Sequence, residues 1–175
     1  LQVIAVGLNP LDVKLLKNPI NEIMGLKLPF IGGRDFTAIV VDNSCVMDSR
    51  FQQGSVVWGM TPNPMKDGSL CEFLCLKEEF VTLAPRRHGV RFDPVSLASM
   101  PLVGLTVVES MEPYLNWLKK RNETPEGKRI LIQGGSGGVG SFAVQYARSL
   151  GMFVVATTSP RNFAWVQSLG VDEVL

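Results

Sequence analysis

The sequence predicts an α/β protein in which an all-β module precedes a parallel sheet covered by helices. Three observations predict it. Short β-rich runs separated by turn-forming residues fill residues 1–100. A glycine-rich turn follows an apolar run at 129–133. From there on, apolar runs of strand length alternate with helical patterns, which is typical of a parallel sheet with helices on both faces.

The first module contains short runs with strand character between clusters of Gly, Pro, Asn and Asp. The strands are expected at Leu1–Val6, Phe36–Asp42, Ser55–Trp58, Leu70–Leu76 and Phe80–Leu83. A short helical turn is expected at residues 10–14. Strands at this spacing indicate a barrel or a bent sheet.

Two helices are expected after this module. Asp93 is placed to be the N-cap of the first, with Pro94 at its first helical position. The second is expected at 104–119, where apolar residues recur on one stripe. A polar stretch with Pro125 follows, so residues 101–126 are expected to form a connecting helix and linker.

Residues 127–175 predict the first βαβαβ half of a doubly wound sheet. Its strands are expected at 129–133, 152–157 and 173–175, and its helices at 138–150 and 162–169. The chain opens inside a strand, without an initiator Met, and stops inside another strand. We therefore expect it to be a fragment of a longer chain.

The glycine-rich turn carries the most specific motif. Gly135, Gly137 and Gly140 satisfy G-x-G-x-x-G between a strand and a helix. Such glycines permit a tight turn, let a pyrophosphate approach the backbone and let the helix pack closely. The helix then directs its N–H groups at the phosphates. The alternative is a turn without a ligand, but the flanking strand and helix favour a Rossmann dinucleotide-binding domain.

The choice of cofactor is expected to depend on the end of the next strand, about 20 residues further on. NAD sites usually place an acidic residue there, whereas this chain has Thr157-Thr158-Ser159-Pro160-Arg161. Hydroxyl groups and a guanidinium could bind a 2′-phosphate. The sequence therefore favours NADPH over the alternative of a solvated loop whose arginine faces water.

Composition excludes several classes of function. The chain has 17 Lys and Arg against 16 Asp and Glu, which gives no electrostatic case for binding nucleic acid. No apolar run approaches the roughly 20 residues of a transmembrane helix. Cys45, Cys71 and Cys75 are spaced unlike a zinc site, and His88 is the only histidine, so a structural zinc finger is excluded. The odd cysteine count favours a reducing, intracellular compartment.

Several short sequence motifs are spread over nearly the whole chain. They are Gly7–Asp12 (G-x-N-P-x-D), Gly33–Val40, Phe51–Trp58, Gly68–Phe73, Pro101–Thr106, the glycine-rich turn and Leu169–Val174. Together they resemble the zinc-free quinone oxidoreductase branch of the medium-chain dehydrogenase/reductase superfamily. Gly33-Arg34-Asp35 and the segment around Trp58 are similar to the mitochondrial reticulon-interacting oxidoreductases of that branch.

The resemblance implies a GroES-like β-barrel domain over residues 1–100, which binds substrate, followed by a Rossmann NADPH-binding domain. Zinc-dependent relatives have a cysteine in place of Asn9 and a His-Glu pair in place of Arg34-Asp35. No zinc ion would then polarise a carbonyl group. This suits hydride transfer to quinones or α,β-unsaturated carbonyls, which are already electron-poor.

The resemblance also implies roles for individual residues. Asn9 would lie near the nicotinamide and orient its carboxamide or the acceptor oxygen, with Asp12 supporting it; the alternative for both is helix capping. Thr106 would contact the nicotinamide ribose, or only bond within its own helix. The other cofactor-binding residues would be Gly135, Ser136, Gly137, Gly138, Val139 and Gly140 at the pyrophosphate, and Thr158, Ser159 and Arg161 at the adenosine phosphate.

Two departures from the family pattern favour a second hypothesis. Lys14 stands where many quinone reductases have a tyrosine, and Leu70 stands where an aromatic residue is usual. The alternative is therefore a catalytically weak cofactor-binding subunit or assembly factor in a larger complex. An enoyl reductase module of a megasynthase is disfavoured, because such modules usually read N-F-R-D where this chain has Asn9-Pro10-Leu11-Asp12. Relatives commonly form homodimers.

Overall fold

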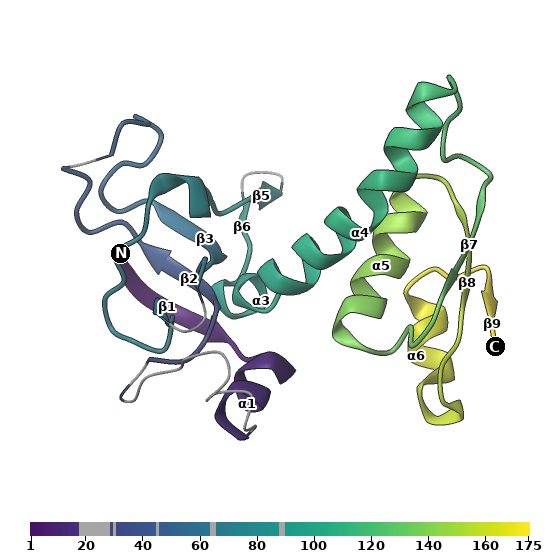
Figure 1. Ribbon diagram of the computed structural model, residues 1–175, viewed down its shortest axis with the longest axis horizontal. Helices are drawn as coiled ribbons and strands as arrows, with labels where there is room; N and C mark the ends of the chain where they lie inside the picture. The colour runs from purple at the N-terminus through teal and green to yellow at the C-terminus, as the bar shows by residue number, and fades with distance from the viewer. Residues whose placement is uncertain (18–28, 30, 45, 64–65, 88–89) are drawn as a thin grey trace. The chain divides into compact units, whose positions relative to one another are not determined.

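The computed structural model describes residues 1–17, 29, 31–44, 46–63, 66–87 and 90–175. The chain divides into two units, Leu1–Leu102 and Val103–Leu175. The first unit contains a four-stranded antiparallel sheet and a two-stranded hairpin, and the second contains a three-stranded parallel sheet (Figure 1). The predicted α/β fold class is confirmed.

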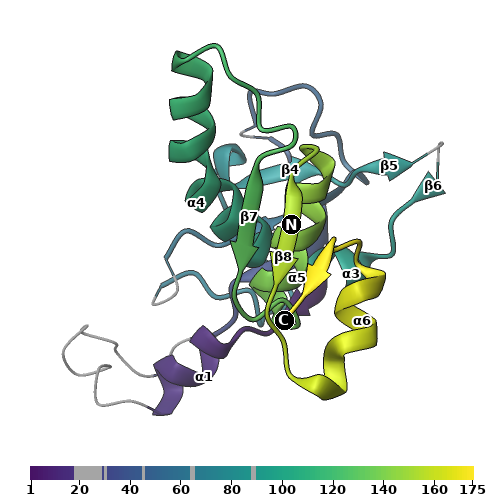
Figure 2. The ribbon, with the colours of Figure 1, turned by 90° about the vertical axis from the view of Figure 1, so that its right-hand side faces the viewer.

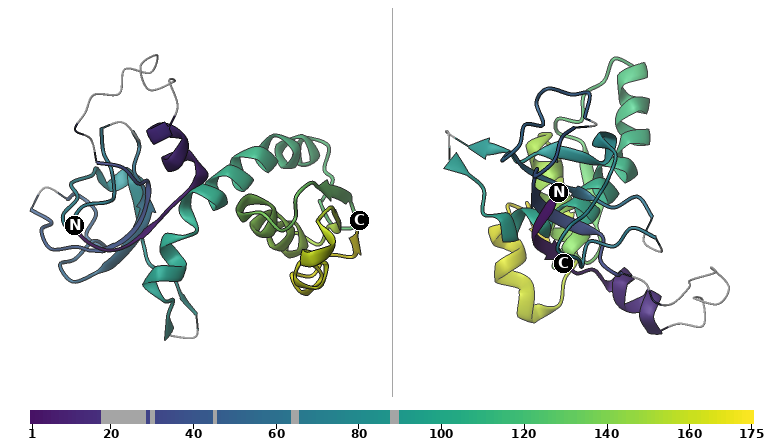
Figure 3. Two further views of the ribbon diagram at one scale, coloured as in Figure 1. Left: turned by 90° about the horizontal axis from the view of Figure 1, so that it is seen from below. Right: turned by 90° about the vertical axis from the view of Figure 1, so that its left-hand side faces the viewer.

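The large sheet of the first unit is formed by four strands that are neighbours in chain order. They are β1 (Gln2–Gly7), β2 (Asp35–Ile39), β3 (Val56–Met60) and β4 (Val81–Leu83). The strands bend around an apolar core (Figure 3) that contains Phe36, Val40, Phe51, Val57 and Leu74. Because β2 lies inside the sheet, four of its five residues are buried.

The strand predicted at Leu70–Leu76 is wrong. The segment makes only an isolated bridge between Phe73 and Gln2, with hydrogen bonds from Val3 N to Glu72 O and from Leu74 N to Leu1 O. A tight turn, in which Cys71 N donates to Ser69 O at 2.8 Å, precedes this short pairing. The segment therefore follows the start of β1 without building a ladder. The hairpin of β5 (Arg86–Arg87) and β6 (Val90–Arg91) was not predicted from the sequence.

The helices of the first unit are short. Helix α1 (Pro10–Lys17) is longer than the single turn predicted from the sequence. Helix α3 (Pro94–Ala98) begins as predicted, because the Asp93 side chain accepts a hydrogen bond from Ser96 N at 2.9 Å. The residue Gly7 makes the close approach of α3 to β1 possible, since a Cβ atom there would overlap the carbonyl group of Ala98.

The second unit follows the predicted order of strands and helices closely. Its elements are β7 (Arg129–Ile132), α5 (Gly138–Ser149), β8 (Phe153–Ala156), the 3-10 turn η2 (Pro160–Asn162), α6 (Phe163–Ser168) and β9 (Glu173–Val174). The strands are parallel in the order β7-β8-β9 (Figure 2). Helix α4 (Pro101–Lys120) begins three residues before the predicted position and contains Pro113.

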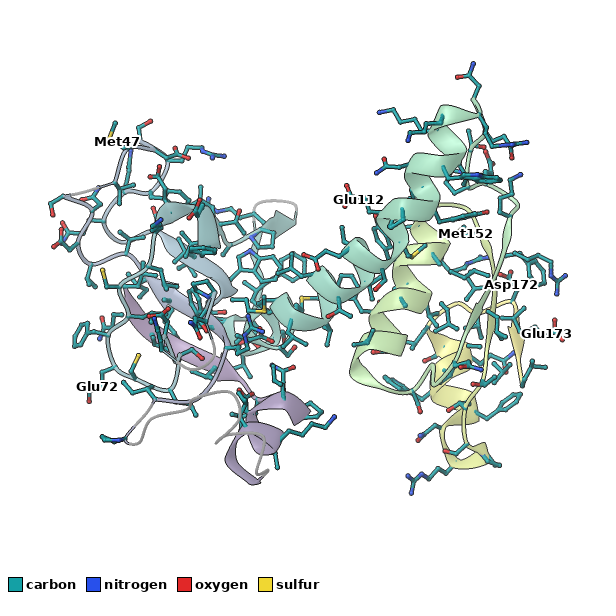
Figure 4. All side chains as sticks on the ribbon, viewed as in Figure 1. Met47, Glu72, Glu112, Met152, Asp172 and Glu173 are labelled. Atoms are coloured by element: carbon teal, nitrogen blue, oxygen red, sulfur yellow. The ribbon has the colours of Figure 1, made fainter. Side chains whose placement is uncertain are left out.

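The core of the second unit lies between the sheet and its helices. It includes Val144 and Ala147 of α5, Val154 of β8 and Val166 of α6, all fully buried. Asp172 ties these layers together: its carboxylate accepts from Val154 N at 2.7 Å and from Arg148 Nη1 at 2.9 Å. Figure 4 labels Asp172 beside Glu173, at the β9 end of this sheet. No helix in the described ranges is long and apolar enough to cross a membrane.

Candidate functional site

The glycine-rich turn lies between β7 and α5, and its backbone is fixed by the end of β8. Gly134 N donates to Thr157 Oγ1 at 3.1 Å, and Gly135 N donates to Thr157 O at 2.9 Å. The turn closes with Gly137 N donating to Gly134 O at 2.9 Å. A Cβ atom on Gly140 would overlap that same carbonyl group, so only glycine permits α5 to start so close to the turn.

Helix α5 has no side chain at its N-terminus to accept hydrogen bonds. Its N-cap is Gly137, and no side-chain cap is present. The amides of the first three helical residues, Gly138, Val139 and Gly140, have no carbonyl group four residues earlier within the helix. A helix N-terminus of this kind favours an anion, because free N–H groups and the positive end of the dipole face outward.

The other residues predicted at the cofactor lie in the same unit. Gly135 is buried, Ser136 is half-buried, and Gly137 is exposed. Thr106 is exposed on α4, two residues after Gly104, whose missing side chain leaves room for the ring of Phe142 of α5. The start of α4 thus packs on α5 within the second unit.

The end of β8 contains one polar atom without a partner. Thr158 Oγ1 is buried and makes no hydrogen bond with the described residues. Ser159 and Arg161 are exposed, and Arg161 forms no hydrogen bond or ion pair with the part of the chain that the structure describes. Sequence reasoning left Thr157 out of the site, although Thr157 holds the turn; its signal is a hydroxyl residue at the end of the adjacent parallel strand.

The first unit contains a cluster of buried polar side chains. Asn9, Asp12 and Asp35 are only 8%, 9% and 0% exposed, respectively. Asn9 Nδ2 donates to Asp35 Oδ2 at 2.9 Å, although the two residues are 26 positions apart in the sequence. The second carboxylate oxygen of Asp35 accepts from Leu102 N, in the first turn of α4, at 3.0 Å.

Asp12 fixes the backbone of Asn9. Asp12 Oδ2 accepts from Asn9 N at 2.7 Å, and Asp12 N donates to Asn9 O at 3.0 Å. This reciprocal pair caps the start of α1, as the capping alternative for Asp12 predicts. The Asn9 side chain takes no part in it, because its amide group is bonded to Asp35.

Burial raises the pKa of Asp35 above its usual value. The hydrogen bonds from Asn9 and Leu102 and the charge of Arg34 act in the opposite direction, whereas Asp12 adds to the increase. Arg34 donates from Nη2 to Thr61 O at 2.9 Å, and its buried Nε atom has no partner among the residues that the structure describes. Sequence reasoning identified Asp35 as part of a family motif and through the residue it replaces in zinc-dependent relatives, but its hydrogen bonds were missed. An acidic residue opening a buried strand was the available signal.

Possible metal ligands and the two positions that depart from the family pattern can also be located. In the described ranges, no group of three or more His, Cys, Asp or Glu residues could hold a metal ion. His88 and Cys45 lie outside the described residues. Lys14 and Leu70, which depart from the family pattern, are both exposed.

A large cavity lies elsewhere in the first unit. It has a volume of about 930 Å³ and is lined by residues such as Val40, Phe51, Leu74 and Glu78. None of the residues predicted from the sequence lines it. The buried polar cluster is therefore a better candidate than this cavity, because it combines charged and amide groups in defined hydrogen bonds.

Comparisons with known proteins match the whole chain. No protein-family model matches it. It is 33% identical to a trans-enoyl reductase from Aspergillus terreus (pgmF), covering 99% of this chain and 47% of the relative. It is 34% identical to the mitochondrial NAD(P)H oxidoreductase RTN4IP1 of Bos taurus, covering 100% and 45%. The structure of a quinone oxidoreductase from Coxiella burnetii superposes with a TM-score of 0.80 at 26% identity, covering 99% and 51%. The chain thus spans about half the length of these relatives.

Proposed function

We propose that the chain belongs to a zinc-independent oxidoreductase that uses NADPH. The premise is that its homologues are quinone oxidoreductase-like members of the medium-chain dehydrogenase/reductase superfamily. The acceptor would be a quinone or an α,β-unsaturated carbonyl. Residues 1–100 would form the GroES-like substrate domain, 101–126 the connection, and 127–175 the first half of the cofactor domain. The N-terminus of α5, capped only by Gly137, carries the proposal.

The residues of the second unit fit a dinucleotide. The pyrophosphate would be bound by main-chain N–H groups, because Gly137 offers no side chain and a cradle without Cβ atoms lies beside it. NADPH, when bound, supplies a hydride to the acceptor. The set proposed for it is Thr106, Gly135, Ser136, Gly137, Gly138, Val139, Gly140, Thr158, Ser159 and Arg161.

The end of β8 supports NADPH rather than NADH. No acidic residue stands at 157–161. The buried Thr158 Oγ1 atom has no partner among the described residues, and Arg161 makes no ion pair with them. A phosphate on the adenosine ribose would supply acceptors for both groups, and charge-assisted bonds of this kind are the stronger ones.

The first unit supports catalysis without zinc. Asn9 and Asp12 are the proposed catalytic residues, with Asp12 holding the Asn9 backbone. An amide, a guanidinium and a carboxylate stand where zinc-dependent relatives have thiolate and imidazole ligands. Both carboxylate oxygens of Asp35 are already engaged by Asn9 and Leu102. The chain's own contribution would then be to orient the reactants.

The full-length protein tests the proposal. It should oxidise NADPH in the presence of a quinone or an enone. Arg161→Ala should weaken NADPH binding about tenfold, the value of one exposed charge-assisted contact, and leave NADH binding unchanged. Arg121→Ala is the matched control, because it removes the same charge from a guanidinium already paired with Glu123 at 2.9 Å. Equal effects of both variants, or inactivity with both acceptor classes, would contradict the proposal.

A second function is favoured by Lys14 and Leu70, which leave the first unit poor in aromatic groups for stacking a quinone. The protein would then be a catalytically weak cofactor-binding subunit or assembly factor. Isolation in a stable complex, with NADPH bound and no turnover, would support this function over the first. We propose a mitochondrial or cytoplasmic location, and a homodimer or a larger complex as the oligomeric state. Native mass spectrometry and cell fractionation measure these two properties.

A further inference from the structure

We propose that Asp35 is a positioning residue that turns the amide nitrogen of Asn9 inward, so that Asn9 presents its carbonyl oxygen, a hydrogen-bond acceptor, to the ligand. The inference rests on the proposed function, in which Asn9 acts near the nicotinamide. It decides a question that the family resemblance leaves open, namely whether Asn9 contacts the carboxamide of the cofactor or the oxygen of the substrate.

The orientation of the Asn9 amide follows from the partners of Asp35. Its Oδ1 atom accepts from Leu102 N at 3.0 Å, and Oδ2 faces Asn9 at 2.9 Å. The atom of Asn9 that faces Oδ2 is Nδ2, so Asn9 directs its NH2 group, a donor, toward the carboxyl group. The first-turn amide of α4 favours the charged form, because free N–H groups and the positive dipole end gather there.

The oxygen of the Asn9 side chain is left for a ligand. It accepts no hydrogen bond from the residues that the structure describes, and it is not one of their buried unpaired atoms. Because Asp12 holds the Asn9 backbone and Asp35 holds its NH2 group, neither end of the residue can rotate without breaking a buried bond.

The chemistry of this oxygen selects the group it contacts. An acceptor pairs with a donor, and the carboxamide NH2 of a nicotinamide is a donor. The carbonyl oxygen of a quinone or an enone is an acceptor and would face the Asn9 oxygen without a hydrogen. The structure therefore assigns Asn9 to holding the nicotinamide carboxamide, and leaves stabilisation of the substrate oxygen to other groups.

The substitution Asp35→Asn should reverse the orientation of the Asn9 side-chain amide while keeping the hydrogen bonds among residues 9, 35 and 102. The N–H group of Leu102 is fixed in the backbone and needs an acceptor, so the new side chain must turn its oxygen toward it. Its NH2 group then faces Asn9, which can satisfy it only by turning its own oxygen inward. The variant should fold, with Asn9 now presenting a donor to the ligand.

The double substitution Asn9→Asp/Asp35→Asn should again place a hydrogen-bond acceptor of residue 9 toward the ligand. A carboxylate at position 9 accepts from the amide at position 35 with one oxygen and presents the other outward. In the full-length protein, kcat/KM for NADPH should fall about 10- to 100-fold in Asp35→Asn, as for the loss of a buried hydrogen bond to the reacting complex, and should recover at least partly in the double variant.

The matched control is Thr37→Val, in the same strand. Thr37 is fully buried and donates from Oγ1 to Pro94 O at 2.9 Å, so the variant loses a buried hydrogen bond without touching Asn9. It should keep the wild-type kcat/KM. Equal activities of Asp35→Asn and Thr37→Val, or a double variant no better than Asp35→Asn, would overturn the inference.

A spectroscopic measurement separates this inference from the proposed function. In the full-length wild-type protein labelled with ¹⁵N-asparagine, one side-chain amide proton of Asn9 should be shifted downfield and exchange slowly with water. Asp35→Asn should remove that signature from Asn9 and give it instead to the side-chain amide at position 35. Its absence in the wild type would overturn the inference even if NADPH turnover is normal, whereas its presence in a protein without turnover would overturn only the proposed function.

Discussion

The candidate site of the second unit consists of main-chain groups, whereas that of the first unit consists of side chains. In the second unit, main-chain N–H groups at the start of α5 form the site, and glycines make room for it. In the first unit, the side chains of Asn9, Asp12 and Asp35 form the site and are buried in hydrogen bonds with one another and with Leu102. One site is open backbone, and the other is a closed network of side chains.

This difference decides how each site responds to substitution. A backbone site is damaged by adding atoms, because an extra methyl group blocks the approach of turn, helix and ligand. A buried side-chain network is damaged by exchanging donors and acceptors even where the volume stays the same. Four predictions test this contrast, in order of decreasing effect.

The largest effect is expected for Gly140→Val. The new side chain would overlap the carbonyl group of Gly134, so α5 must move away from the turn. Unfolding free energy should fall by about 3 kcal/mol, the upper range for overpacking, and NADPH binding should be lost in calorimetry. Gly137→Ala is the control for stability, because its Cβ atom would lie at 3.4 Å from the nearest atom. Similar destabilisation of both variants would contradict the claim that overlap with the Gly134 carbonyl group is what damages the backbone site.

The next largest effect is expected for Asp172→Ala. It removes a charged acceptor from Val154 N, at 2.7 Å, and from Arg148. Unfolding free energy should fall by about 2 kcal/mol, as for a charge-assisted bond to a partly buried amide. Glu173→Ala, one residue away, removes only an exposed ion pair with Arg129 and should cost about 0.5 kcal/mol or less. Denaturant unfolding of the two variants gives the comparison.

The third prediction concerns pH and Asp35. The pKa of Asp35 is raised in the folded state, mainly by burial. Its contribution to stability is therefore complete below the ordinary pKa of 3.8 and is lost as pH rises through the folded value. Compared with Asp35→Asn, the wild type should lose stability over that interval by at most about 1.4 kcal/mol per pH unit, the limit for one proton. Asp93 should show the opposite sign, because its pKa is lowered by hydrogen bonds from Ser96.

The smallest effect is expected for Gly54→Ala in the first unit. Gly54 has φ of 83°, and no atom lies within 4 Å of a Cβ atom built there. Only backbone strain opposes the substitution, so unfolding free energy should fall by about 1 kcal/mol. Gly54→Asn should cost less, because asparagine tolerates this conformation. If the two variants were equally destabilised, crowding rather than strain would be the cause.

The second unit was the more predictable from sequence, for a physical reason. Its strands and α5 end within one or two residues of the predicted positions, because buried parallel strands are continuous apolar runs and helices have a periodic apolar pattern. The glycine spacing also predicted the turn, since the contacts that require glycine join residues only a few positions apart, such as Gly134 and Gly140.

The first unit was less predictable because its decisive contacts join distant residues. Asn9 and Asp35 are 26 positions apart, and Asp35 and Leu102 are 67 positions apart. No local pattern gives such pairs. The same limit explains the wrong strand at 70–76, where β-prone residues meet only the start of β1 and form a single bridge. The catalytic role of Asn9 and Asp12 stays a prediction; that Asn9 is hydrogen-bonded to both Asp12 and Asp35, and through which atoms, required the structure.

The uncapped start of α5 has a consequence for the lifetime of the protein. Since Gly137 provides no acceptor of its own, whatever anion binds there acts as a ligand of the folded state alone. If that anion is the dinucleotide proposed above, mass action makes resistance to heat and to proteases follow its concentration, with about 2.7 kcal/mol gained at 100 times the dissociation constant. Depletion of the nucleotide pool would then shorten the half-life of this polypeptide before any change in its synthesis.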